Sequence, residues 1–180
     1  MFKMNQSTEQ IIVKIIEDAL NNLFSIDKII LDAKLKEECI NHVIAVYIKK
    51  SLDANTDFKD EKYFVDLEYN KITKTGGPKK SIKGKNIRPD IIIHKRDDEE
   101  ENNLCVLEIK KNYCIKADKD KIIGLLKSNL KYKYGFAVSL KLDRKSGPLV
   151  KFYQRDLIEK NENDVRDYYF DVNNKELKEK

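Results

Sequence analysis

Two carboxylates and a lysine stand at the ends of two neighbouring apolar runs. Asp90 opens the run DIIIH, and Glu108 and Lys110 close the run LCVLEIK. Side chains alternate along a strand, so Glu108 and Lys110 should share one face while Ile109 takes the other. If the runs pair as a hairpin centred near Glu99, Asp90 falls opposite Glu108. Such a cluster could hold a hard divalent cation and position a water.

These residues resemble the active-site signature of a known enzyme superfamily. Pro89-Asp90 and Glu108-Ile109-Lys110 match the two halves of the signature of PD-(D/E)xK nucleases, which have the restriction-endonuclease-like fold. The stretch RPDIIIHKR followed by NNLCVLEIKK is also similar to short bacterial members of this superfamily. The resemblance implies a Mg²⁺ ion, for which Mn²⁺ can substitute, held by Asp90, Glu108 and the backbone carbonyl of Ile109.

Hydrolysis of a phosphodiester is the reaction that this resemblance implies. The reaction needs a water nucleophile, in-line geometry and relief of the charge that builds on the phosphate. Carboxylates that bind Mg²⁺ serve these needs, so Asp90 and Glu108 are the candidate ligands. Lys110 would orient the water or stabilise the charge. A lysine beside two carboxylates should keep its proton, which favours these roles over that of general base.

A third acid could complete the site. Glu68 lies near the end of the preceding apolar run, on its polar side. In the resembling proteins such an acid comes from this strand or from the helix before it, where Glu37 and Glu38 are the candidates. A solvated surface position is the alternative for all three glutamates.

Basic residues lead into the first motif. The segment 71–88 carries seven lysines and arginines and no acid. It could hold a phosphate backbone without reading sequence, or it could be a solvated loop. The candidate nucleic-acid contacts are Lys79, Lys80, Lys83, Lys85, Arg88 and His94. Arg88 could instead pair with Glu68 or Glu108, and His94 could be packed. Lys121, at the start of the next expected helix, could face phosphate or solvent.

Periodicity and turn signals predict an α/β fold. A Ser7–Gln10 capping box opens a helix, a second helix starts near Asp32, and residues 7–52 are expected to be helical. Strands are expected at 63–69, 90–94, 104–109, 134–140 and 149–153, with a helix at 118–130. The order αβββαβ and a central mixed sheet flanked by helices coincide with the core of the resembling superfamily. We expect one domain over 1–180, with its core at 62–155 and a charged tail at 156–180.

Composition is compatible with a nucleic-acid partner without requiring one. The chain of 180 residues has a net charge of +5, and its acids and bases are mixed along most of its length. No apolar run is long enough to span a bilayer, and the three cysteines lack metal-type spacing. A cytoplasmic protein without membrane contact is expected.

The resulting hypothesis is a Mg²⁺-dependent nuclease acting most readily on DNA. The alternative is a non-catalytic nucleic-acid-binding or adaptor module that keeps the nuclease fold. A homodimer or a subunit of a larger system is compatible with either function.

Overall fold

The computed structural model describes residues 7–33, 35–58, 60–71, 76–79, 84, 86–97, 102–141, 147–161 and 163–180. The helices of this part of the chain are α1 (Thr8–Ser25), α2 (Lys28–Asp32), α3 (Glu37–Ala54), α4 (Lys116–Leu126) and α5 (Arg155–Lys160). In these described ranges, no helix combines the length and the apolar character that a membrane crossing requires.

Seven strands of the described chain form one mixed sheet, in which spatial order follows chain order. They are β1 (Phe64–Leu67), β2 (Ile91–His94), β3 (Asn103–Lys110), β4 (Tyr134–Ser139), β5 (Leu149–Gln154), β6 (Val165–Asp171) and β7 (Glu176–Glu179). Strands β3 and β4 are parallel, and the other neighbouring pairs are antiparallel. A parallel pair needs a crossover connection, and α4 provides it. The predicted α/β class with a mixed sheet is confirmed.

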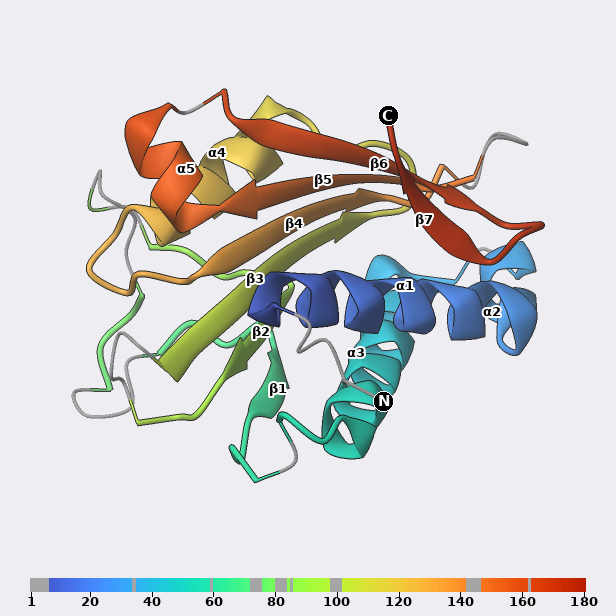
Figure 1. Cartoon of the computed structure of the whole chain (residues 1–180), viewed down its shortest axis with the longest axis horizontal. Helices are drawn as coiled ribbons and strands as arrows, with labels where there is room; N and C mark the ends of the chain where they lie inside the picture. The colour runs from blue at the N-terminus through green and yellow to red at the C-terminus, as the bar shows by residue number, and fades with distance from the viewer. Residues whose placement is uncertain are drawn as a thin grey trace, which may run out of the picture.

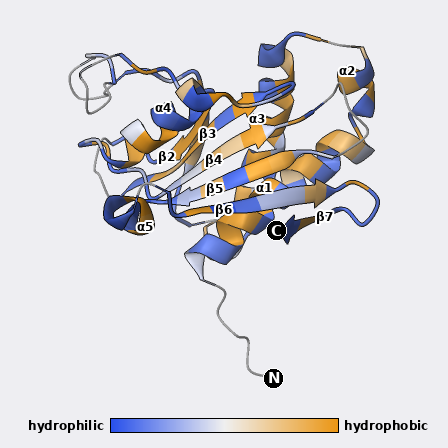
Figure 2. Cartoon of the chain, turned by 90° about the horizontal axis from the view of Figure 1, so that it is seen from above, coloured by the Kyte–Doolittle hydropathy of each residue, from blue (hydrophilic) through white to orange (hydrophobic). Residues whose placement is uncertain are grey.

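Helices cover both faces of the sheet (Figure 1, Figure 2). The apolar sides of α1 and α3 share a buried core with Ile91, Ile93 and Leu107. On the opposite face, α4 and α5 pack with Ile92 and Val106. Both faces of β2 and β3 are therefore buried, which explains why these strands read as continuous apolar runs.

The start of the chain's first helix follows the expected capping chemistry. The Ser7 hydroxyl accepts a hydrogen bond from the Gln10 N–H at 3.3 Å, and the Gln10 side chain accepts one from the Ser7 N–H at 3.0 Å. This reciprocal pair satisfies two N–H groups that have no partner within the helix. The predicted start of the second helix, near Asp32, does not agree with the structure. The short α2 ends at Asp32, and α3 begins only at Glu37.

The expectation of a charged tail at 156–180 is wrong. Residues 155–160 form α5, and β6 and β7 complete the sheet beyond β5. Tyr168 and Phe170 of β6 are buried, whereas Tyr169 between them is exposed. This alternation is that of a strand with one face on a core. The charged residues of the segment occupy the other positions and obscured the pattern.

Candidate functional site

The pairing of β2 with β3 brings the two halves of the motif together. Ile91 pairs with Leu107 and Ile92 with Val106, so the same register extended by one residue places Asp90 beside Glu108. The Asp90 Oδ2 atom accepts a hydrogen bond from the backbone N–H of Ile109 at 2.8 Å. The predicted register is confirmed, and this bond fixes the Asp90 carboxylate at the end of β3.

Lys110 lies between two carboxylates. Its ammonium donates to Asp90 Oδ2 at 3.1 Å and to Glu37 Oε1 at 2.8 Å. It also donates to the carbonyl of Ile109 at 3.2 Å. Burial would lower the pKa of Lys110, but the hydrogen bond that it donates to Glu37 and the charge of Asp90 raise this pKa above its ordinary value. The ammonium therefore keeps its proton, as the sequence predicted.

Glu37 belongs to this cluster through the first turn of α3. Its second oxygen, Oε2, accepts a hydrogen bond from the backbone N–H of Lys111 at 3.3 Å. The Glu37 carboxylate thus accepts hydrogen bonds both from the backbone just after β3 and from the ammonium of Lys110. A carboxylate in the first turn of a helix is also favoured by the helix dipole.

Glu108 is fully buried on the face covered by α4. Burial and the nearby charge of Asp90 raise the pKa of its carboxyl to about 7, although Lys121 acts in the opposite direction. Lys121 of α4 donates to Glu108 Oε2 at 2.5 Å and to the carbonyl of Arg88 at 3.4 Å. The other oxygen, Oε1, is buried and has no hydrogen-bond partner.

Close packing of α4 on β4 positions Lys121. A methyl group at Gly135 of β4 would overlap the Cγ2 atom of Ile122, the residue that follows Lys121. Only glycine allows α4 to approach β4 this closely, so the reach of Lys121 to Glu108 depends on it.

The donor set fits a hard divalent cation that keeps part of its water shell. A buried carboxylate oxygen without a partner, as at Glu108 Oε1, leaves a polar group unsatisfied. Asp90, Glu108 and the carbonyl of Ile109 are oxygen donors, which Mg²⁺ prefers. No group of three or more His, Cys, Asp or Glu side chains suited to a metal occurs in the described ranges. A cation held here would therefore take its remaining ligands from backbone, substrate or water.

Glu68, the candidate third acid, contacts the cluster only through its backbone. Its N–H donates to the carbonyl of Asp90 at 3.0 Å. Its half-exposed side chain points to Arg88, with 3.4 Å between Glu68 Oε1 and Arg88 Nη2. The ion pair considered for Arg88 is thus present at the surface. Arg88 remains exposed near the cluster, since its carbonyl contacts Lys121.

The prediction that His94 contacts nucleic acid is wrong, because the side chain is buried at 2 % exposure. Its Nε2 lies 2.8 Å from Asp66 Oδ2, and its ring lies against Tyr69 with 4.9 Å between centroids. Four residues along a strand also correspond to about 13 Å, so His94 is remote from Asp90. It serves to pack β1 against β2.

The prediction for Lys79 is also wrong. Its side chain is 1 % exposed, and its ammonium donates to the hydroxyl of Tyr132 at 2.8 Å. The same ammonium lies 5.2 Å from the ring centroid of Tyr69. The buried Lys79 side chain therefore anchors its segment of the chain to the core. The other predicted loop contacts, Lys80, Lys83 and Lys85, lie outside the described residues.

Sequence reasoning gave too little weight to Glu37 and Lys121. Both are first-turn or second-turn helix residues, and their contact with the motif depends on how α3 and α4 cross the end of the sheet. In the sequence, the only indication of these contacts is an acid or lysine near the start of each helix next to the motif strands. This indication does not distinguish Glu37 from Glu38 or Lys121 from Lys119.

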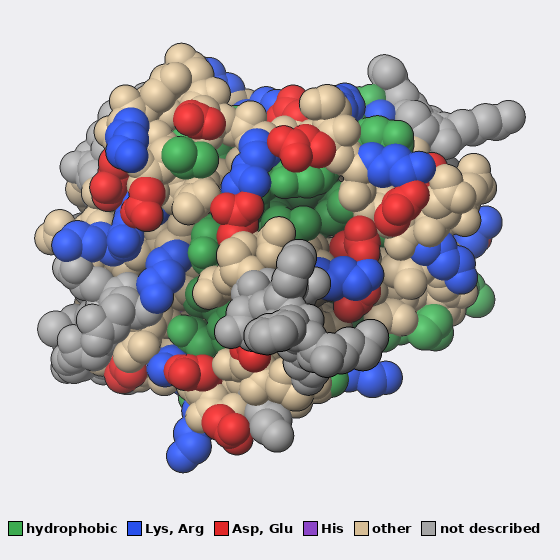
Figure 3. Space-filling view, in the orientation of Figure 1, with side chains coloured by type: hydrophobic (Ala, Val, Ile, Leu, Met, Phe, Trp, Pro, Cys, Tyr) green, Lys and Arg blue, Asp and Glu red, His purple; other side chains and the backbone are tan. Residues whose placement is uncertain are grey.

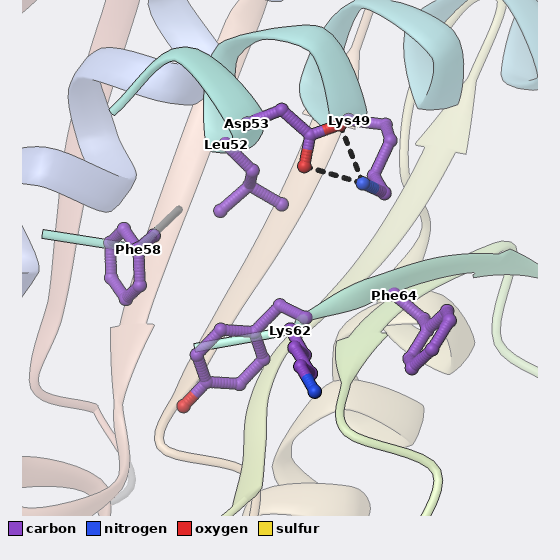
Figure 4. Close-up of a pocket in the computed structure, with 7 residues that line it drawn as sticks. Lys49, Leu52, Asp53, Phe58, Lys62 and Phe64 are labelled. Carbon is purple, nitrogen blue, oxygen red and sulfur yellow. Dashed lines mark hydrogen bonds and ion pairs between the residues drawn. The ribbon is translucent and has the colours of Figure 1, made fainter. Parts of the chain in front are cut away.

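Other surface features lie apart from this cluster. On the face that α1 crosses, Lys and Arg side chains are interspersed with Asp and Glu (Figure 3). A surface hollow of about 290 Å³ lies between the end of α3 and β1 (Figure 4). Its only described ion pair joins Lys49 to Asp53 at 2.5 Å, among residues that include Phe58 and Phe64.

The chain was compared with known protein families, with curated proteins and with solved structures, and none of them matched.

Proposed function

We propose that the protein is a Mg²⁺-dependent nuclease that hydrolyses phosphodiester bonds in DNA through Asp90, Glu108 and Lys110. The observation that carries this proposal is the buried Glu108 carboxylate, whose Oε1 has no partner, next to Asp90 and a charged Lys110. A cation at this point would satisfy that oxygen. The element order α3, β1, β2, β3, α4, β4 supports the restriction-endonuclease-like core that the motif resembles.

Each residue of the cluster has a role in this proposal. Asp90, Glu108 and the Ile109 carbonyl would hold the cation, which when bound supplies charge for the phosphate and lowers the pKa of water. Lys110 stays protonated and can orient the attacking water or contact a phosphate oxygen. Glu37 holds the Lys110 ammonium in place through its hydrogen bond.

The pair of Lys121 and Glu108 supports a second function. A lysine at 2.5 Å already neutralises the buried carboxylate without any metal. This arrangement suits a non-catalytic module that keeps the fold and binds nucleic acid by charge alone. Such a module would bind DNA in EDTA with strong salt dependence, and Glu108→Gln would leave binding intact.

Cleavage of plasmid and oligonucleotide DNA separates the two functions. The purified protein should cut DNA in Mg²⁺ or Mn²⁺ and not in EDTA. Asp90→Asn, Glu108→Gln and Lys110→Met should each lower the rate by roughly 100-fold or more. Asp53→Asn, in the surface pair with Lys49, is the matched control and should cut normally. Cleavage that survives all three substitutions, or none by the wild type in either metal, would contradict the nuclease proposal.

A further inference from the structure

Two lysines contact the carboxylates of the cluster, and Lys110 is the more firmly held of the two. Its ammonium donates to Glu37 Oε1 at 2.8 Å and to Asp90 Oδ2 at 3.1 Å. A third hydrogen bond, at 3.2 Å, goes to the carbonyl of Ile109. An ammonium group has three protons to donate, and these three acceptors use all of them. Lys110 would lose two carboxylate partners by moving, so we expect it to stay in place.

Lys121 has fewer partners and more freedom to move. Its ammonium donates to one carboxylate oxygen, Glu108 Oε2, at 2.5 Å, and its contact with the carbonyl of Arg88 is longer, at 3.4 Å. The side chain is 29 % exposed, so solvent already reaches it. Lysine has a flexible four-carbon stem and a strongly hydrated ammonium, so water can replace the partners of an ammonium that swings outward. Of the two ammonium groups, that of Lys121 can leave the cluster at the smaller cost.

Glu108 is closed to solvent while Lys121 stays on it. The Glu108 side chain has no accessible surface, and its Oε1 atom is buried without a hydrogen-bond partner. A hydrated divalent cation can therefore touch neither oxygen unless a neighbouring group moves. Because Lys121 covers Oε2, the outward movement of this one side chain would open the carboxylate.

Charge balance also favours the withdrawal of Lys121. With the carboxylates ionised, Glu37, Asp90 and Glu108 together with the ammonium groups of Lys110 and Lys121 carry one negative charge. A bound dication would turn this into one positive charge if both lysines stayed, and into neutrality if Lys121 withdrew. Like charges in a buried site repel strongly, because little solvent screens them.

We propose, building on the cation site of the function above, that Lys121 is an internal counter-ion that a divalent cation displaces. In the metal-free protein its ammonium neutralises Glu108. When a cation binds between Asp90 and Glu108, this ammonium moves outward to solvent while Lys110 remains. Binding then requires the loss of the ion pair between Lys121 and Glu108, so the pair lowers the apparent affinity of the site for cations.

Cation binding measured without nucleic acid tests this inference separately from cleavage. Mn²⁺ binding is followed by isothermal titration calorimetry at pH 8, and the binding that Glu108→Gln abolishes is assigned to the cluster. Lys121→Met should tighten this binding by about tenfold, because the competing paired form is removed. Lys121→Gln keeps a hydrogen-bond donor for Glu108, which limits any loss of stability, and it should also bind Mn²⁺ more tightly than the wild type.

Two further variants serve as controls. Lys116→Met removes one positive charge from an exposed position of the same helix and should leave the Mn²⁺ affinity unchanged. Lys121→Arg keeps the charge and should bind Mn²⁺ no more tightly than the wild type.

Equal or weaker Mn²⁺ binding in the folded Lys121→Met and Lys121→Gln proteins overturns the inference, because Lys121 and the cation would then share Glu108. The same gain in Lys116→Met also overturns it, since net charge would explain the effect. Absence of Glu108-dependent binding in every variant overturns it together with the cation site. A protein that binds Mn²⁺ as expected but never cleaves DNA contradicts only the nuclease proposal.

Discussion

At the scale of single residues, Glu108 is the most constrained group of the cluster. It is a fully buried carboxyl with one oxygen on Lys121 and the other without a partner. Its pKa of about 7, raised chiefly by burial, means that metal-free protein holds it partly protonated near neutral pH. A cation or a more strongly held Lys121 would stabilise the ionised form.

Lys121→Met should therefore destabilise the protein in a pH-dependent way. At pH 8 the wild-type Glu108 carboxylate is largely ionised and bonded to Lys121. Without Lys121 it must stay charged with no partner or take up a proton, which should cost roughly 1–3 kcal/mol. As pH falls through 7 the carboxyl becomes neutral, so the cost should shrink. Urea unfolding in EDTA at pH 8 and pH 5.5 measures both values.

Lys116→Met is the control for this prediction, because it removes an exposed lysine from the same helix. An exposed pair contributes about 0–1 kcal/mol. Equal effects of Lys121→Met and Lys116→Met at pH 8 would show that the contact with Glu108 does not stabilise the fold.

At the scale of elements, β1 and β2 are joined by a buried polar group. Asp66 of β1 accepts from His94 of β2 and from the guanidinium of Arg96. Burial lowers the pKa of His94, even though the hydrogen bond with Asp66 acts to raise it. The neutral imidazole is therefore the form that the folded state favours.

His94 should make stability fall under mildly acidic conditions. The unfolded chain binds a proton at an ordinary pKa of about 6.5, and the folded chain binds it only at lower pH. Between these values the unfolded state holds more protons, so stability is complete above about pH 6.5 and declines below it. His94→Gln should remove part of this decline, as measured by urea unfolding between pH 8 and pH 5.

The second histidine of the chain provides the control, since His42 is exposed on α3. His42→Gln should leave the pH dependence as it is in the wild type. The same decline in wild type and His94→Gln would contradict the assignment of a neutral buried imidazole.

Some contacts between the elements could be predicted from the sequence, and others could not. The register of β2 on β3 followed from pairing the two apolar runs as a hairpin centred near Glu99, which places Asp90 opposite Glu108. The burial of His94 did not follow, since it depends on Tyr69 and on the loop that carries Lys79. These contacts join segments far apart in the chain, and no local pattern encodes them.

At the scale of the whole molecule, the C-terminal strands belong to the core. The Phe170 ring of β6 is buried and lies 6.0 Å from the ring centroid of Phe24 on α1. The first helix and the last part of the sheet therefore stabilise one another. This packing is hard to predict from the sequence, because residues 156–180 are highly charged and only the inward positions of β6 are apolar.

Phe170→Ala should destabilise the protein by about 3–5 kcal/mol, the usual cost of emptying a buried aromatic site. Its neighbour Tyr169 is 38 % exposed on the opposite side of β6, so Tyr169→Ala should cost far less. Urea unfolding of the two variants compares them directly. Equal and small effects would place β6 outside the cooperative core.

The central claim is that the cluster of Asp90, Glu108 and Lys110 is a divalent cation site. A crystal structure with Mn²⁺, recorded with its anomalous signal, tests it most directly. An anomalous peak is expected between the carboxylates of Asp90 and Glu108, within coordination distance of the Ile109 carbonyl. The peak should disappear in Glu108→Gln. A well-ordered site with no peak at millimolar Mn²⁺, and with Lys121 still paired to Glu108, would contradict the claim.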